Sequence, residues 1–188
     1  MSGIANRKPA LVIAAAVAAT AIMLYWMGRL PICECGYVKF WHGVVLSAEN
    51  SQHVFDWYTA THVVHGFLFY YLAHLAAPRF SVGWRLAAAT LVECAWEILE
   101  NTNAVIERYR ENTISLDYFG DSIVNSMGDV VAMMAGFLFA ARLPVWATVL
   151  LAVVAEAFLV WQIRDNLTLN VLMLVWPVDA VLRWQAGG

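Results

Sequence analysis

The sequence predicts an all-α integral membrane protein: a polytopic transmembrane helix bundle with five to six membrane-spanning helices, in a single domain over residues 1–188. Hydrophobic residues make up 62% of the chain and charged residues only 13%, whereas soluble domains carry about 25% charged residues. Apolar runs recur at close to the length that crosses about 30 Å of hydrocarbon. Nine Trp and seven Tyr residues also supply aromatic anchors for the membrane surfaces.

The first expected span, residues 10–28, follows a short basic segment that contains Arg7 and Lys8. A cleavable signal peptide would have a shorter apolar core and a small-residue cleavage site. This apolar run reaches about 18 residues, near the length of a full crossing, and ends close to Tyr25 and Trp26. We therefore interpret it as an uncleaved helix. The flanking basic pair favours a cytoplasmic N-terminus.

Five further apolar segments follow the first long connection. We place these spans at 57–77, 83–105, 120–141, 143–163 and 167–184. The last contains Pro177 and Asp179, so lying along the surface is the alternative to crossing. With six crossings, the two long connections, 28–56 and 106–119, lie on the same side of the membrane. The net charge of −3 and the absence of a basic stripe argue against nucleic acid as a partner, which leaves membrane lipid.

Acidic residues within the expected spans are the strongest functional signal. There are seven of them: Glu93, Glu97, Glu100, Asp121, Asp129, Glu156 and Asp179. A carboxylate in the middle of a bilayer costs about 2.5 kcal/mol or more, so such residues normally face a protein interior and have a function. Their number exceeds what hydrogen bonding between helices alone requires.

Helical periodicity sorts these residues into stripes. Glu93, Glu97 and Glu100 share one face of the third span, and His62 and His65 share a face of the second. A similar stripe on the fourth span has a spacing of four residues and consists of Asp121, Asn125 and Asp129. At about 1.5 Å rise per residue, seven side chains lie roughly 8–14 Å below the face that carries the long loops: His62, His65, Glu97, Glu100, Asn125, Asp129 and Glu156. The pattern predicts a polar pocket near the outer face, roofed by those loops.

Three kinds of chemistry fit this layer. His62 and His65 with neighbouring carboxylates are ligand types for an unidentified divalent metal, which could activate water. Paired carboxylates could instead act as acid and base without a metal. Transport or proton relay needs polar groups through the full depth of the membrane, and the cytoplasmic half offers only His74 and Asp179. A purely structural role in helix association is the fourth alternative.

Cys33 and Cys35 in the first long connection are a weaker signal. With His42 and His53 they could form a soft metal site. A disulfide between residues two apart would close a small, strained ring. We therefore expect the pair to shape a turn after Pro31.

Several strings resemble an uncharacterised family of multi-pass, mainly alphaproteobacterial inner-membrane proteins, a domain of unknown function. They are Pro31-Ile32-Cys33-Glu34-Cys35-Gly36-Tyr37, Ser51-Gln52-His53, Asp56-Trp57-Tyr58, Trp96-Glu97-Ile98, Glu100-Asn101, Gly120-Asp121-Ser122, Gly128-Asp129 and 164–170. The resemblance implies a multi-pass protein of the bacterial inner membrane and implies no activity. The third and fourth spans are also loosely similar to VanZ-like membrane proteins, which is a likeness of arrangement only.

The sequence thus predicts a membrane-embedded site, with hydrolysis of a lipid or lipid-linked substrate as the preferred hypothesis. The expected catalytic residues are Glu97, Glu100, Asp121 and Asp129; the expected substrate-binding residues are Asn101, Arg108, Arg110 and Asn125; and the expected metal ligands are His62 and His65. The two arginines would hold an anionic headgroup. The alternatives are a non-catalytic membrane assembly or stability factor and a proton-linked transporter.

Overall fold

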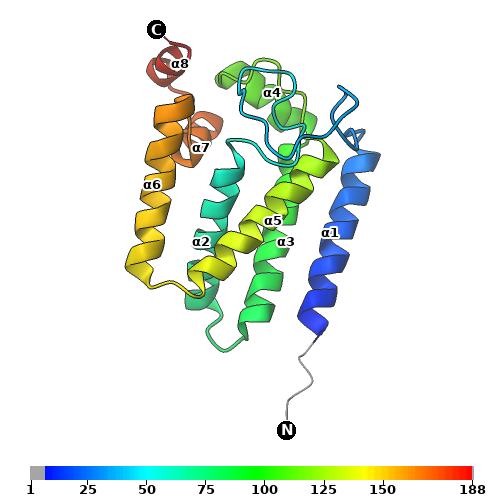
Figure 1. Cartoon of the computed structure of the whole chain (residues 1–188), viewed down its shortest axis with the longest axis vertical. Helices are drawn as coiled ribbons and strands as arrows, with labels where there is room; N and C mark the ends of the chain where they lie inside the picture. The colour runs from blue at the N-terminus through cyan, green and yellow to red at the C-terminus, as the bar shows by residue number, and fades with distance from the viewer. Residues whose placement is uncertain (1–6, 188) are drawn as a thin grey trace.

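The computed structural model describes residues 7–187, and this part of the chain contains eight α-helices and no strand (Figure 1). The helices are α1 (Lys8–Trp26), α2 (Thr59–Ala76), α3 (Val82–Glu100), α4 (Asn103–Asn112), α5 (Ile123–Ala140), α6 (Val145–Ile163), α7 (Leu167–Val175) and α8 (Asp179–Gln185). Five of them have 18 or 19 residues and form the long bundle. The prediction of an all-α fold is confirmed.

Local sequence signals explain where the long helices begin and end. Ser81 accepts a hydrogen bond from the backbone N–H of Trp84 at the start of α3, and Ser122 does the same for Asn125 at the start of α5. Pro144 comes directly before α6, and Arg164 ends that helix in the left-handed conformation. These signals divide the apolar stretch between residues 120 and 163 into two helices.

Three helices, α1, α5 and α6, are long and apolar enough to cross a membrane, and they indicate membrane association. The helices α2 and α3 have the same length, but they carry the histidines and glutamates of the predicted polar stripes and are not clearly apolar. The structure therefore supplies fewer clearly apolar spans than the five to six that the sequence predicts.

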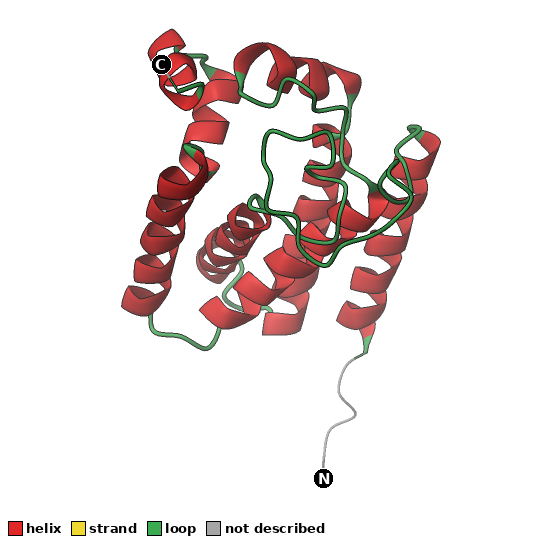
Figure 2. Cartoon of the chain, turned by 45° about the horizontal axis from the view of Figure 1, so that its top comes forward, coloured by secondary structure: helices red, strands yellow, loops and turns green. Residues whose placement is uncertain are grey.

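The two long connections lie at the same end of the bundle, opposite the first residues of α1, as the sequence analysis expected (Figures 1 and 2). The second of them holds α4, because the expected span 83–105 ends at Glu100 and a new helix begins at Asn103. The expected sixth span, 167–184, consists of α7 and α8, of nine and seven residues. At 1.5 Å per residue α7 rises only about 14 Å, so neither helix crosses the hydrocarbon by itself. The break includes Pro177, which cannot donate to a helical hydrogen bond.

The helices α2 and α5 pack most extensively against each other, through glycines. A Cβ atom added at Gly66 would lie 2.1 Å from the carbonyl oxygen of Met133, and one at Gly136 would lie 2.2 Å from the carbonyl oxygen of Val63. Small residues of this kind let two backbones approach closely. Below the polar layer, Leu86 and Ala89 of α3 pack with Met133 and Phe137 of α5 in an apolar core.

Gly66→Ala is expected to lower the free energy of unfolding by about 1–3 kcal/mol, because its methyl group would push α2 away from the α5 backbone. Unfolding of the purified protein in mixed detergent micelles measures the change. Gly83→Ala is the matched control, since a Cβ there would meet Pro9 at an ordinary 3.5 Å. Equal stability of both variants and the wild type would contradict the close packing.

Candidate functional site

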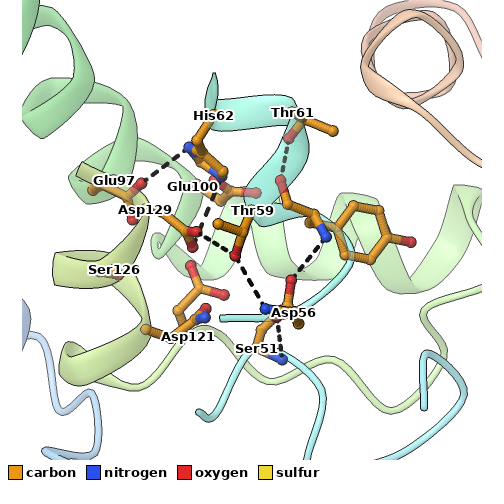
Figure 3. A network of polar contacts seen from close by, with 12 residues as sticks. Ser51, Asp56, Thr59, Thr61, His62, Glu97, Glu100, Asp121, Ser126 and Asp129 are labelled. Atoms are coloured by element: carbon orange, nitrogen blue, oxygen red, sulfur yellow. Dashed lines mark hydrogen bonds and ion pairs between the residues drawn. The ribbon is translucent and has the colours of Figure 1, made fainter. Parts of the chain in front are cut away.

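The polar stripes of α2, α3 and α5 meet inside the bundle, near the end that carries the long loops (Figure 3). His62 comes from the first turn of α2, Glu93 and Glu97 from the second half of α3, and Asp129 from the second turn of α5. All four side chains are buried, with 6% of His62, 4% of Asp129 and neither glutamate exposed. The periodicity of each helix therefore aims its polar residues at one buried point.

His62 is the centre of this cluster. Its Nδ1 atom lies 2.5 Å from Glu93 Oε1 and 3.7 Å from Glu97 Oε1, and its Nε2 atom lies 3.8 Å from Asp129 Oδ2. His65, one turn further along α2, places its Nδ1 atom 3.2 Å from the other oxygen of Glu93. One imidazole thus has a carboxylate on each of its two nitrogen atoms.

Glu97 differs from its neighbours. Both of its carboxylate oxygens are buried and neither has a hydrogen-bond partner within the described part of the chain. Leaving a buried polar group unpaired costs about 1–3 kcal/mol, and more when it is charged. Such a group in a folded protein calls for a partner such as a proton, water or an ion.

A second layer of hydrogen bonds connects α3 with the segment before α5. Asn101 donates to Asp121 Oδ2 at 2.9 Å, and the backbone N–H of Asp121 donates to Asn101 Oδ1 at 2.7 Å. Tyr118 donates to the other oxygen of Asp121 at 3.0 Å. Asn101 is therefore a structural partner of Asp121 at the helix end and does not line the cavity described below.

The first long loop supports the cluster from above. Thr59 donates to Asp129 Oδ1 at 3.0 Å and accepts from the backbone N–H of Asp56 (Figure 3). The Asp56 carboxylate in turn accepts from the backbone N–H groups of Ser51 and Tyr58. Asn125 donates to the carbonyl oxygen of His53 at 2.9 Å, which ties α5 to the same loop. The hydrogen bonds made by Thr59 and Asn125 hold the first long loop over the carboxylates.

A cavity of about 220 Å³ opens beside the cluster. Its polar lining includes His62, His65, Glu100, Asp121, Asn125 and Asp129. Its apolar lining comes from Phe69 on α2, Val92 on α3, and Leu167 and Val171 on α7. Val92 and Val171 are also exposed on the outer surface of the bundle. The cavity thus runs from buried carboxylates to the apolar exterior.

The predicted basic residues do not reach this cavity. The Arg108 Nε atom donates to the carbonyl oxygen of Leu174 at 2.9 Å and so joins α4 to α7. Arg110 lies exposed on α4. Among the described residues that line the cavity, none is Lys or Arg. The structure therefore places neither arginine on the wall of this cavity.

Glu156 lies outside the cluster, which corrects the expectation that α6 contributes to the polar layer. Glu156 accepts hydrogen bonds from the backbone N–H groups of Leu167 and Thr168 at 3.0 Å each, and from the Thr168 hydroxyl at 2.6 Å. It thereby caps the N-terminus of α7, where a carboxylate is stabilised by the helix dipole. Asp179 is an exposed residue in the first turn of α8.

The first loop contains a separate polar network. Cys33 and Cys35 shape the expected turn, because the backbone N–H of Gly36 donates to the carbonyl oxygen of Cys33 at 3.1 Å. The two cysteines also form a disulfide, so the thiolates of a soft metal site are not available in this state. Glu49 accepts from Lys39 at 2.7 Å and lies 3.1 Å from His53 Nε2. The Lys39 hydrogen bond, followed by those from His53 and Tyr37, lowers the pKa of Glu49 to about 2. Glu49 is therefore ionised at neutral pH and holds the loop together.

The C-terminal helices are attached to this end through Asp165. It accepts hydrogen bonds from the Tyr58 hydroxyl and from Gln185 Nε2, both at 3.1 Å. Burial raises the pKa of Asp165 to about 6. Because Tyr58 and α7 both line the cavity, this contact helps to define its wall.

Sequence reasoning missed several aromatic and polar lining residues. Tyr58, Trp96, Tyr109 and Asn170 all face the cavity, and Tyr109 donates to Glu100 Oε1 at 2.8 Å and to Asn170 Oδ1 at 2.9 Å. Three of these four occur in the strings that carry the family resemblance, which is the signal that could have found them. Tyr109 carries no comparable signal, because α4 was expected to be a loop.

Comparisons with known proteins agree with the resemblance. A family model described as "Protein of unknown function (DUF2585)" matches residues 24–187. A UPF0314 protein of Paracoccus denitrificans (strain Pd 1222) is 61% identical over 166 residues, which cover 88% of this chain and 86% of the relative. A UPF0314 protein of Rhizobium meliloti (strain 1021) is 60% identical over 185 residues, covering 97% and 94%, and one of Novosphingobium aromaticivorans is 58% identical over 175, covering 90% and 88%. No solved structure matches the chain.

Proposed function

This chain belongs to the DUF2585 (UPF0314) family of proteins of unknown function. From the geometry of its own site, we propose that it is a membrane-embedded hydrolase of a lipid or lipid-linked substrate. The protein is placed in the bacterial inner membrane with five spans, α1, α2, α3, α5 and α6. In this arrangement α7 and α8 lie at the outer face and close one side of the cavity.

The surface of the long bundle supports this placement. The helix α6 exposes apolar residues around most of its circumference, among them Trp146, Leu150, Val153 and Trp161. A helix with so much exposed apolar surface is stable in lipid and prone to aggregation in water. The Cys33–Cys35 disulfide favours an oxidising compartment for the loop end, and Arg7 and Lys8 favour a cytoplasmic N-terminus.

The observation that carries the proposal is the two-sided cavity. Val92 and Val171 lie both on the cavity wall and on the exposed surface that would face lipid, so an acyl or prenyl chain can enter sideways. The polar end of the same molecule then meets Glu100, Asp121 and Asp129. A membrane lipid has this combination of an apolar tail and a polar head.

Hydrolysis follows from the arrangement of the carboxylates. Asp129 lines the cavity, and Thr59 and His62 hold it in place, so it is the proposed base that takes a proton from water. Asp121 lines the same cavity, where Tyr118 and Asn101 set its orientation, and is the proposed acid that protonates the leaving group. Acid–base pairs of this kind accelerate reactions about 10²–10⁴-fold per group. The apolar core of Leu86, Ala89, Met133 and Phe137 below the cluster favours a one-sided site over a proton conduit.

The test uses vesicles made from alphaproteobacterial polar lipids and lipid-linked intermediates, suspended in ¹⁸O-labelled water. The wild-type protein is expected to release a product that carries one ¹⁸O atom, detected by mass spectrometry. Val92→Trp should block the entry and lower product formation at least about tenfold, the effect of about 1.4 kcal/mol on the barrier. Leu91→Trp is the matched control, because Leu91 is equally exposed on α3 and does not line the cavity.

An absence of ¹⁸O-labelled product from every lipid class would refute the hydrolase. Equal rates for Val92→Trp and Leu91→Trp would refute sideways entry. A wild-type protein that makes no product but co-purifies with a stable protein partner would instead support the assembly factor.

A further inference from the structure

We propose that the cluster binds one divalent transition-metal cation, held by His62, Glu97 and Glu100. This inference rests on the proposed function, because it assigns the cofactor of the same site. Each of the three residues offers one ligand atom, and these atoms all lie within 4.8 Å of one another. Metal–nitrogen and metal–oxygen bonds of about 2.0–2.2 Å place two ligand atoms of one ion about 3–4 Å apart.

The separation between His62 and Glu97 matches this requirement better than it matches a hydrogen bond. The 3.7 Å between His62 Nδ1 and Glu97 Oε1 is too long for an N–H···O bond, which ends at about 3.2 Å. It is close to the separation of two ligand atoms across a bound ion. These two side chains are therefore spaced as ligands of one ion would be.

The unpartnered carboxylate of Glu97 is independent support. It is completely buried, and both oxygens are without a hydrogen-bond partner within the described residues. Every other carboxylate of the cluster has a hydrogen-bond donor: a histidine for Glu93, Tyr109 for Glu100 and Thr59 for Asp129. Glu97 alone lacks one, and a cation bound next to it satisfies both its charge and its lone pairs.

The surroundings of His62 also resemble those of a metal-binding histidine. Such a histidine usually donates its second ring N–H group to a carboxylate, which fixes its tautomer and orientation. Glu93 lies beside Nδ1 of His62 and Asp129 faces Nε2. The separation from Glu97 makes Nδ1 the nitrogen that binds the ion, and Asp129, 3.8 Å from Nε2, is then the carboxylate that faces the second ring nitrogen. Tyr109 holds one oxygen of Glu100 and leaves the other oxygen for the ion.

The charge of the cavity gives the cation a role toward the substrate. The described lining contains several carboxylates and no Lys or Arg, so an anionic phosphate group would be repelled. A divalent cation would reverse that repulsion and would polarise water or a phosphoryl oxygen for hydrolysis. One imidazole with two carboxylates suits zinc, manganese or iron better than a soft ion such as copper(I).

The first loop provides an internal control. Cys33, Cys35, Glu49 and His53 also have ligand atoms within 4.8 Å of one another, but the two sulfur atoms are bonded to each other, and Glu49 is already paired with Lys39. The loop is therefore expected to bind no ion while the disulfide is intact, and Glu49→Gln is a matched control for Glu97→Gln.

The experiment uses the full-length protein in detergent, stripped with a chelator and then titrated with Co²⁺, whose visible absorption reports a protein-bound ion. Zn²⁺ competition gives the affinity. The wild type and Glu49→Gln are expected to bind one ion per chain with equal affinity. Glu97→Gln and Glu100→Gln should each weaken binding at least tenfold. Helical circular dichroism and gel filtration identify the variants that fold. If Glu97→Gln does not fold, Glu100→Gln serves as the test.

Three results would overturn the site: no saturable Co²⁺ signal in the wild type, wild-type affinity in the folded glutamate variants, or loss of the ion in Glu49→Gln. The Co²⁺ absorption reports binding of the ion whether or not the protein hydrolyses a substrate. ¹⁸O-labelled product from a wild type that shows no saturable Co²⁺ binding would refute this site and leave the hydrolase standing. Stoichiometric Co²⁺ binding without any lipid product would support the metal site and refute the hydrolase.

Discussion

Asp129→Asn is expected to reduce kcat for the lipid or lipid-linked substrate by about 10²–10⁴-fold. The amide keeps the shape of the side chain and can still accept the hydrogen bond from Thr59, which lies 3.0 Å from Asp129 Oδ1. It cannot take a proton from water.

Rates of ¹⁸O-labelled product formation by the two proteins at saturating substrate measure this effect. Glu156→Gln is the control, because Glu156 is the carboxylate that caps α7 and lies outside the cavity. It should keep kcat within about twofold, a change of less than 0.5 kcal/mol in the barrier. If Asp129→Asn retained the wild-type rate, Asp129 would not be the base, and the acid–base assignment would fail.

The polar layer could be predicted from the sequence because three stripes with helical periodicity start at known distances from the ends of their helices. His62, Glu97 and Asp129 meet in the structure for this reason. The argument failed for Glu156. The distance of Glu156 from the end of α6 gives its depth in the bundle, but it does not give the direction in which the side chain points. Glu156 points toward the start of α7 and not toward the cluster.

The loops and short helices could not be predicted by the same method. Pro177 was visible as a helix breaker, yet nothing in the local sequence shows that α7 returns to line the cavity through Leu167 and Val171. Arg108 was expected to bind a headgroup and instead joins α4 to α7, a contact between residues 66 positions apart. Interactions of this kind depend on tertiary packing, which periodicity does not report.

The stability of the cluster depends on His62 for a physical reason that sequence spacing cannot supply. His62 is the histidine next to Glu93, Glu97 and Asp129 together. Removing one partner from a buried group of charges leaves the others uncompensated, which costs about 3–5 kcal/mol in measured cases.

His62→Leu is therefore expected to lower the free energy of unfolding by about 3 kcal/mol or more, measured by unfolding in mixed detergent micelles. His74→Leu is the matched control on the same helix. His74 is exposed and its hydrogen-bond partner is the buried Arg85, at 2.9 Å, so its loss leaves one donor unpaired and should cost less, about 1–2 kcal/mol. His62→Gln, whose amide can still donate to Glu93, should recover part of the loss. Equal stability of His62→Leu and His74→Leu would mean that the carboxylates do not depend on the imidazole, and that another group, such as a bound cation, holds them together.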